Sequence, residues 1–188
     1  TFNHTLNGIV RALALSPDAK TLYVGGDFTT VDGATRNRLA AFDVATGALT
    51  SWAPSSSGYV NALAASPTRV YAGGAFSRLA GVATTNLGAV TTTGAAVPGF
   101  VANANNVIYA IAVSPAYDKL FLGGAFSAFN GDATYHGAAS ASAATGSTLP
   151  LSAISAVPAL SSGCTSVTKV VLTDATRAYF GNEGSGGG

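Results

Sequence analysis

The sequence predicts an all-β protein, and within that class a β-propeller of about three and a half four-stranded blades that belong to a larger ring. Three observations predict this fold. The 188 residues repeat with a period close to fifty, which is about the length of a four-stranded blade. Each copy consists of short stretches rich in β-branched and aromatic residues, separated at close intervals by Pro, Gly and Asp. No segment carries the apolar stripe of an amphipathic helix.

The first element of each copy is a short apolar strand. Three copies end this strand with Ser-Pro, at residues 10–17, 60–67 and 108–115, and the fourth copy begins at 167–174. The stretch 109–113 is apolar on both faces, which is typical of a strand that lies between two neighbouring sheets. We therefore expect the first strands to line the central axis of the propeller.

The second element ends in a Gly-Gly pair, at 25–26, 73–74 and 123–124. Glycine weakens a strand, so a recurring pair indicates a bulge or a close approach of backbones. We expect each pair to mark a tight contact between neighbouring blades. A phenylalanine follows each pair at the same distance, at positions 28, 76 and 126. Its repetition predicts a core role in every blade.

The repeat divides the chain into four units. They are residues 1–54, 55–100 and 101–150 for three full copies, and 151–188 for an insertion and a truncated fourth copy. The first glycines of the pairs are 48 and 50 residues apart, whereas the step from Gly123 to Gly181 is 58, which indicates an insertion within 148–163. Because propellers have about four to eight blades, we expect the chain to be a piece of a longer protein, or to complete its ring by self-association.

Composition limits the partners that the protein can have. Hydrophobic residues make up 48% of the chain, which suffices for a substantial core. Only 9% of residues are charged and the net charge is +1, so there is no basic stripe for nucleic acid. No apolar run approaches the roughly 18 residues that cross a bilayer. We therefore expect neither a nucleic-acid partner nor a membrane span.

The motifs of the first copy are residues 12–18 (ALALSPD), 22–28 (LYVGGDF), 36–41 (RNRLAA) and 45–47 (ATG). With these motifs the chain resembles the bacterial delta-sixty type β-propeller repeats, found in large, mostly secreted proteins of largely undefined function. The resemblance covers nearly the whole chain apart from the insertion. It implies a propeller and a secreted or cell-surface location, but no particular activity. Cys164 is the only cysteine, and in a secreted parent it would form a disulfide with a partner beyond Gly188.

Residues that break the repeat are the candidates for chemistry, because positions shared by every blade serve packing first. Asp27 breaks it, since Ala75 and Ala125 occupy the equivalent positions. An enzyme acting on polysaccharide at the propeller axis would use Asp27 and Asp174 as acid and base, at a separation of roughly 5–10 Å. A turn or capping role is the alternative for Asp27. The resemblance favours that role, because the family that the chain resembles often has Asp at this position.

Three aromatic side chains are candidate binding residues. Tyr135 and His136 break the repeat in the third copy. Trp52 is the single tryptophan, and it is predicted either to pack in the core or to stack on a carbohydrate. The core role is favoured, because Phe100 lies near the equivalent position of the next copy.

The sequence predicts no metal site and no cofactor. Neither His4 nor His136 has a Cys or carboxylate at metal-ligand spacing, and no phosphate-binding loop is present. The segments Asp32-Gly33 and 130–132 have oxygen side chains and a glycine that would suit calcium. Their spacing is not that of a calcium loop, so plain turns are favoured.

These observations favour a non-enzymatic extracellular scaffold. Such a propeller would bind protein or glycan through the loops between blades, or would build a surface layer or filament through its open blade edges. Abundant Thr, Ser and Gly with few charges fit this interpretation. The alternative is the polysaccharide hydrolase or lyase described above.

Overall fold

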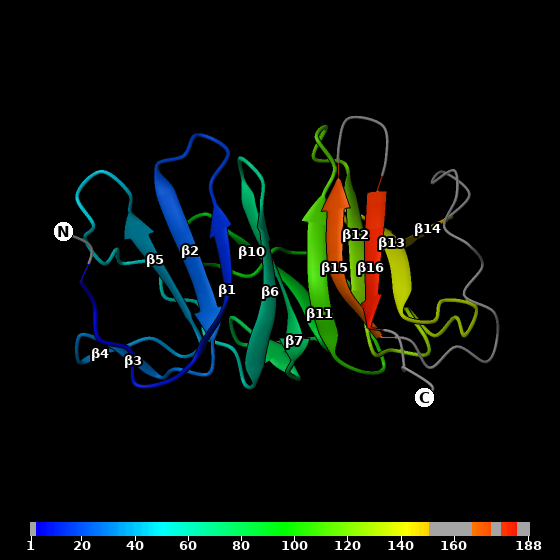
Figure 1. The fold of residues 1–188 in the computed structure, drawn as a ribbon, viewed down its shortest axis with the longest axis horizontal. Coiled ribbons are helices and arrows are strands. Elements are labelled where there is room, and N and C mark those ends of the chain that lie inside the picture. Colours follow the sequence, from blue (N-terminus) through cyan, green and yellow to red (C-terminus); the bar gives the residue numbers. More distant parts are fainter. Residues whose placement is uncertain (1–2, 151–166, 174–177, 184–188) are drawn as a thin grey trace.

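The computed structural model describes residues 3–150, 167–173 and 178–183, and every helix or strand element in these residues is a β-strand. Consecutive strands pair in antiparallel fashion, which forms one main sheet for each copy of the repeat (Figure 1). The all-β prediction is confirmed. Among the described residues, no helix has the length and apolar character to cross a membrane.

The four main sheets follow the order of the repeats. The strand orders are β1-β2-β5 in the first sheet, β10-β7-β6 in the second, β11-β12-β13-β14 in the third and β15-β16 in the fourth. The bounds are β1 Val10–Leu15, β2 Thr21–Gly26, β5 Leu39–Asp43, β6 Tyr59–Ala65, β7 Arg69–Ala75, β10 Leu87–Thr91, β11 Ile108–Val113, β12 Lys119–Gly124, β13 Ala138–Ser142, β14 Thr148–Leu149, β15 Val167–Thr173 and β16 Ala178–Glu183. In the first two sheets the fourth strand is reduced to single bridges, Phe42 with Leu49 and Val90 with Ala96.

Two small hairpins lie between the second and third strands of the first two sheets. They are β3 (Thr30–Val31) with β4 (Ala34–Thr35), and β8 (Arg78–Leu79) with β9 (Val82–Ala83). Their turns are Asp32-Gly33 and Ala80-Gly81, in which all four residues have φ between 47° and 81°. Positive φ at both central residues belongs to the hairpin turn that matches strand twist. Asn130 and Gly131 share this conformation, so the candidate calcium segments form turns.

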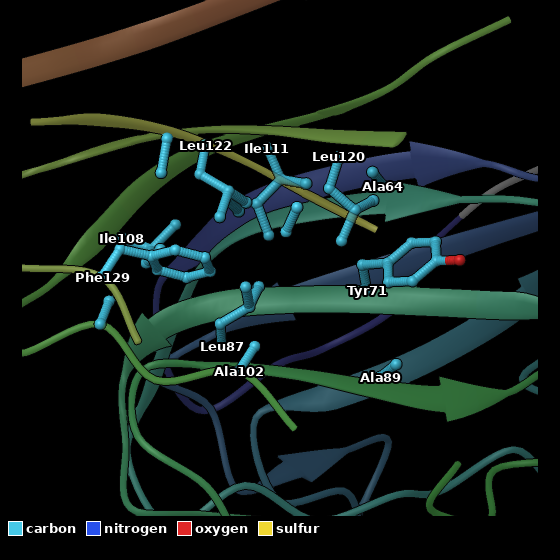
Figure 2. Packing of buried hydrophobic residues seen from close by; sticks show 14 of the residues in the cluster. Ala64, Tyr71, Leu87, Ala89, Ala102, Ile108, Ile111, Leu120, Leu122 and Phe129 are labelled. Carbon is cyan, nitrogen blue, oxygen red and sulfur yellow. The ribbon is translucent and has the colours of Figure 1, made fainter. Parts of the chain in front are cut away.

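The sheets stack through their first strands, because β1 contacts β6, β6 contacts β11, and β11 contacts β15. The core fills the spaces between consecutive sheets. Between the second and third sheets it holds Tyr71 and Leu87 against Ile108 and Ile111 (Figure 2). The two inner strands β6 and β11 are apolar on both faces because a sheet covers each face. The repeated phenylalanines, Phe28, Phe76 and Phe126, are all buried, as their repetition predicts.

Candidate functional site

The outward face of β1 is apolar and exposed. Val10, Leu13 and Leu15, which we call the open face, are all exposed to solvent. This differs from the expectation that every first strand lies between two sheets. The first sheet has the second sheet on one side, and no described residue covers the other.

The equivalent side chains of the second and third sheets are buried, apart from the half-buried Val113. Leu13 is 61% exposed, whereas its equivalents Leu63 and Ile111 are 7% and 8% exposed. Val60 and Leu63 pack toward the first sheet, in a cluster that includes Tyr23 and Leu39. The open face is therefore the face that, in β6, packs against a preceding sheet.

Glycines accept these side chains on the facing sheet. A Cβ atom added to Gly25 would lie 2.6 Å from Val60 Cγ1, and one added to Gly73 would lie 2.5 Å from Ile108 Cγ2 and 2.8 Å from Ile111 Cδ1. Such separations are below van der Waals contact, so only glycine leaves room for the apolar side chains of the next sheet. This is the close contact between units that the Gly-Gly pairs predict.

The second glycine of each pair has a different role. A Cβ at Gly26 would overlap the backbone carbonyl of Ile9, just before the paired strand β1, and one at Gly74 would overlap that of Tyr59 in the paired strand β6. The strand register shifts at this place in each of the four sheets. The second glycine thus leaves room for the bulge that the sequence also predicts, whereas the fourth sheet has the same register shift with Asn182 at this position.

Asp27, the candidate catalytic residue, forms an ion pair at the edge of the open face. Arg11 donates from Nε and Nη2 to the two carboxylate oxygens at 2.5 and 2.6 Å. These hydrogen bonds hold the pKa of Asp27 below its usual range. The Arg11 guanidinium also lies 5.4 Å from the centroid of the Tyr59 ring, so the pair connects the first sheet to the second.

A signal for this pair exists in the sequence. Arg11 replaces the Asn61 and Tyr109 of the second and third copies, and Asp27 replaces their alanines, so among the three full copies both departures fall in the first. Two departures of opposite charge in one copy indicate a partnership between them. Sequence reasoning considered Asp27 alone and therefore missed Arg11.

The other described aspartates serve turns or pair with cations. Neighbouring hydroxyls, backbone amides or cationic side chains donate hydrogen bonds to each carboxylate, and these lower the pKa of every aspartate described: Asp18, Asp27, Asp32, Asp43, Asp118 and Asp132. A general acid needs a pKa raised toward the working pH. None of these six is suited to donate a proton near neutral pH. Asp174 lies outside the described residues.

His4 connects the segment before β1 to the first sheet through two hydrogen bonds. Its Nδ1 atom lies 2.5 Å from Asp32 Oδ2, and its Nε2 atom donates to the carbonyl of Gly47 at 2.7 Å. The imidazole also lies 4.5 Å from the Phe42 ring, between centroids. Because both ring nitrogens face acceptors, the hydrogen bond to Asp32 raises the pKa of His4, and the Gly47 carbonyl adds to the effect.

We expect stability to fall as this imidazolium loses its proton. A raised folded-state pKa adds stability that is complete below the ordinary value of 6.5 and is lost as pH rises through the folded pKa. Asp32 acts in the opposite direction, because its lowered pKa adds stability that disappears only in acid. Between pH 5.5 and 8.5, the wild-type Tm should fall roughly 2–4 °C more than that of His4→Gln, measured by thermal melts. Equal slopes for the wild type and His4→Gln would contradict the role of His4.

Trp52 lies in the core between the first two sheets. Its side chain is buried, its Nε1 donates to the Thr91 carbonyl at 3.2 Å, and its ring meets Tyr23 edge-on at 4.9 Å between centroids. A hydroxyl-rich cleft of about 780 Å³ opens beside it. The lining residues are Ser16, Pro17, Asp18, Thr21, Tyr23, Thr50, Ser51, Trp52, Ser66, Pro67, Thr92 and Thr93. Because the ring is buried, little of its face is left for stacking on a sugar.

The remaining predicted site residues do not gather at one place. Tyr135 packs against the core of the third sheet, and its hydroxyl donates to the Leu149 carbonyl at 3.3 Å. His136 is half-buried beside it, in the segment before β13. Cys164 lies outside the described residues. Within the described part of the chain, no three His, Cys, Asp or Glu side chains are grouped so as to hold a metal ion.

Comparison with known proteins informs only the fold. No known sequence family and no curated protein matches the chain. Its structure is similar to the crystal structure of the computationally designed protein Ika4, with a TM-score of 0.59 and 16% sequence identity. The similarity covers 95% of this chain and 88% of the designed one. At this level of identity the likeness concerns the fold and not the activity.

Proposed function

We propose that the chain is an open segment of a β-propeller and works as a non-enzymatic extracellular scaffold that assembles through the open face. The exposure of Leu13 carries this proposal, because the equivalent leucine and isoleucine of the next two sheets are buried. Soluble proteins leave few contiguous apolar surfaces uncovered unless they serve in binding. The open face is thus a docking surface for a further sheet of the same kind.

The stacking of the sheets supports the propeller part of the proposal. Antiparallel sheets of similar length follow one another with their first strands in contact, which is the arrangement of blades about an axis. The low charge and the many hydroxyl side chains support an extracellular location. The binding of glycan by stacking on Trp52 has less support, since the Trp52 ring is buried.

The electrostatics of the aspartates support a role without catalysis. The two carboxyl groups of a glycosidase differ in protonation, and one must retain its proton. Asp27 is held ionised by Arg11, and the other described aspartates also have lowered pKa values. A scaffold does not need a carboxyl group that retains its proton.

The test is the effect of Leu13→Asp on self-association. Burying one leucine side chain contributes about 1.5–3 kcal/mol, and about 1.4 kcal/mol corresponds to a tenfold change in affinity. Leu13→Asp should therefore raise the dissociation constant roughly tenfold or more, measured by sedimentation velocity over a concentration series. Val82→Asp is the matched control, because Val82 is equally apolar and exposed but lies in the hairpin of β8 and β9. A wild-type chain that stays monomeric throughout would contradict the proposal.

A further inference from the structure

The fourth sheet repeats the geometry of the glycine contact. In β15 and β16, Val170 pairs with Gly181 and Leu172 with Tyr179. The second sheet has the same register, with Ala62 opposite Gly73 and Ala64 opposite Tyr71, and with a register shift at the same place. Gly181 therefore occupies the position of Gly73.

The surface around Gly181 is open, whereas its equivalents are covered. Gly25, Gly73 and Gly123 are all buried, but Gly181 is exposed. Tyr179 is 49% exposed, whereas its equivalent Tyr71 is 1% exposed. We call Tyr179 and Gly181 the socket face. It belongs to the last sheet in the series of contacts and the open face to the first, because β15 contacts β11 and β12 while β1 contacts β6.

The two faces resemble the two surfaces that meet where consecutive sheets pack together within the chain. Inside the chain, Val60 and Leu63 of β6 fill the space over Gly25, and Ile108 and Ile111 fill the space over Gly73. The open face presents Val10 and Leu13 at the positions of Val60 and Leu63, with a bulge at the same place in the strand. The open face thus has the side chains and the socket face has the glycine that receives them.

We propose that copies of this chain associate head to tail, with Val10 and Leu13 of one copy packed over Gly181 and Tyr179 of the next. This proposal rests on the proposed function, since it names the partner of the open face. The contact would continue the stacking that already joins the sheets within the chain. It is heterologous, because each copy contributes a different face.

The alternative pairing of two open faces lacks this fit. It would place Leu13 opposite the bulky side chains of another open face, where no glycine at the Gly25 position lies to receive it. Apolar surfaces that do not interdigitate lose much of their contact energy. The packing of the sheets within the chain therefore favours the head-to-tail arrangement over the symmetric one.

The test uses two variants, each blocked at one end. Leu13→Asp disables the open face, and Gly181→Val fills the space over the socket face. Each variant alone should have a dissociation constant for self-association that is roughly tenfold or more above that of the wild type. An equimolar mixture should form a 1:1 complex of twice 18.5 kDa, or 37 kDa, because one intact open face meets one intact socket face. Mass is read by light scattering after size exclusion.

The outcomes separate this proposal from the one on which it rests. If Gly181→Val associates like wild type while Leu13→Asp does not, the open face is a docking surface but the head-to-tail pairing is wrong. If neither mixture nor wild type associates, both proposals fail. Tyr179→Glu is a second variant of the socket face, and it replaces Gly181→Val if circular dichroism shows that the valine prevents folding. Rescue of Leu13→Asp by either socket variant supports the pairing.

Discussion

Replacing Phe126 by alanine is expected to lower the free energy of unfolding by about 3–5 kcal/mol. The Phe126 side chain is almost fully buried and lies 6.2 Å from Phe129, between ring centroids, within the core of the second and third sheets. Truncation removes the transfer energy of the ring and leaves a cavity that rigid sheets on both sides cannot close. Denaturation by guanidinium chloride, followed by circular dichroism, measures the change.

The repetition of this residue provides the control within the same fold. Phe28→Ala and Phe76→Ala should cost similar amounts, because both rings are buried at the same place in their sheets. Tyr117→Ala should change stability by less than about 0.5 kcal/mol, since this aromatic residue is exposed in a turn. A loss below about 1 kcal/mol for Phe126→Ala would contradict the shared core position.

Features that recur in the three full copies could be predicted from the sequence. The apolar first strands, the Gly-Gly pairs and the buried phenylalanines each have a local cause that acts the same way in each repeat. The pairs illustrate this, because a glycine in a strand has few explanations and both of the predicted ones occur, at Gly25 and Gly26. The closure of the ring and the number of blades remain predictions.

Features that occur once could not be predicted in this way. The hydrogen bonds of His4 to Asp32 and Gly47 join residues 28 and 43 positions apart, and no other copy repeats them with the same residues. Asn130 donates instead to the Gly146 carbonyl at 3.0 Å in the third copy. The exposure of Leu13 could not be predicted either, because the sequence of β1 resembles that of the buried β6. It depends on which sheet lies beside the strand, and local pattern does not contain that information.

The glycine contacts connect the stability of the chain with its proposed assembly. Within the chain, the space over Gly25 and Gly73 is filled by the next sheet, so those glycines contribute to folding. The space over Gly181 faces solvent, so under our proposal that glycine contributes to association instead. Glycine in the same register would then contribute to folding where the neighbouring sheet belongs to the same chain, and to association where that sheet belongs to another copy.

Gly73→Val is therefore expected to lower the free energy of unfolding by about 3 kcal/mol. Its Cβ alone would lie 2.5 Å from Ile108 Cγ2 and 2.8 Å from Ile111 Cδ1. Both isoleucines are buried between two sheets, so they can yield only by leaving their rotamers or by separating β7 from β11. The same denaturation measurement as for Phe126→Ala reports the loss.

The matched control is the same substitution at the equivalent exposed position. In the Leu13→Asp background, which under our proposal weakens association, Gly181→Val should change the free energy of unfolding by no more than about 0.5 kcal/mol. A large loss at Gly73 with none at Gly181 would show that the glycine is required by the side chains of the neighbouring sheet. Equal losses at both positions would instead place the requirement in the strand's own backbone, and the interface would have to be explained without the glycine.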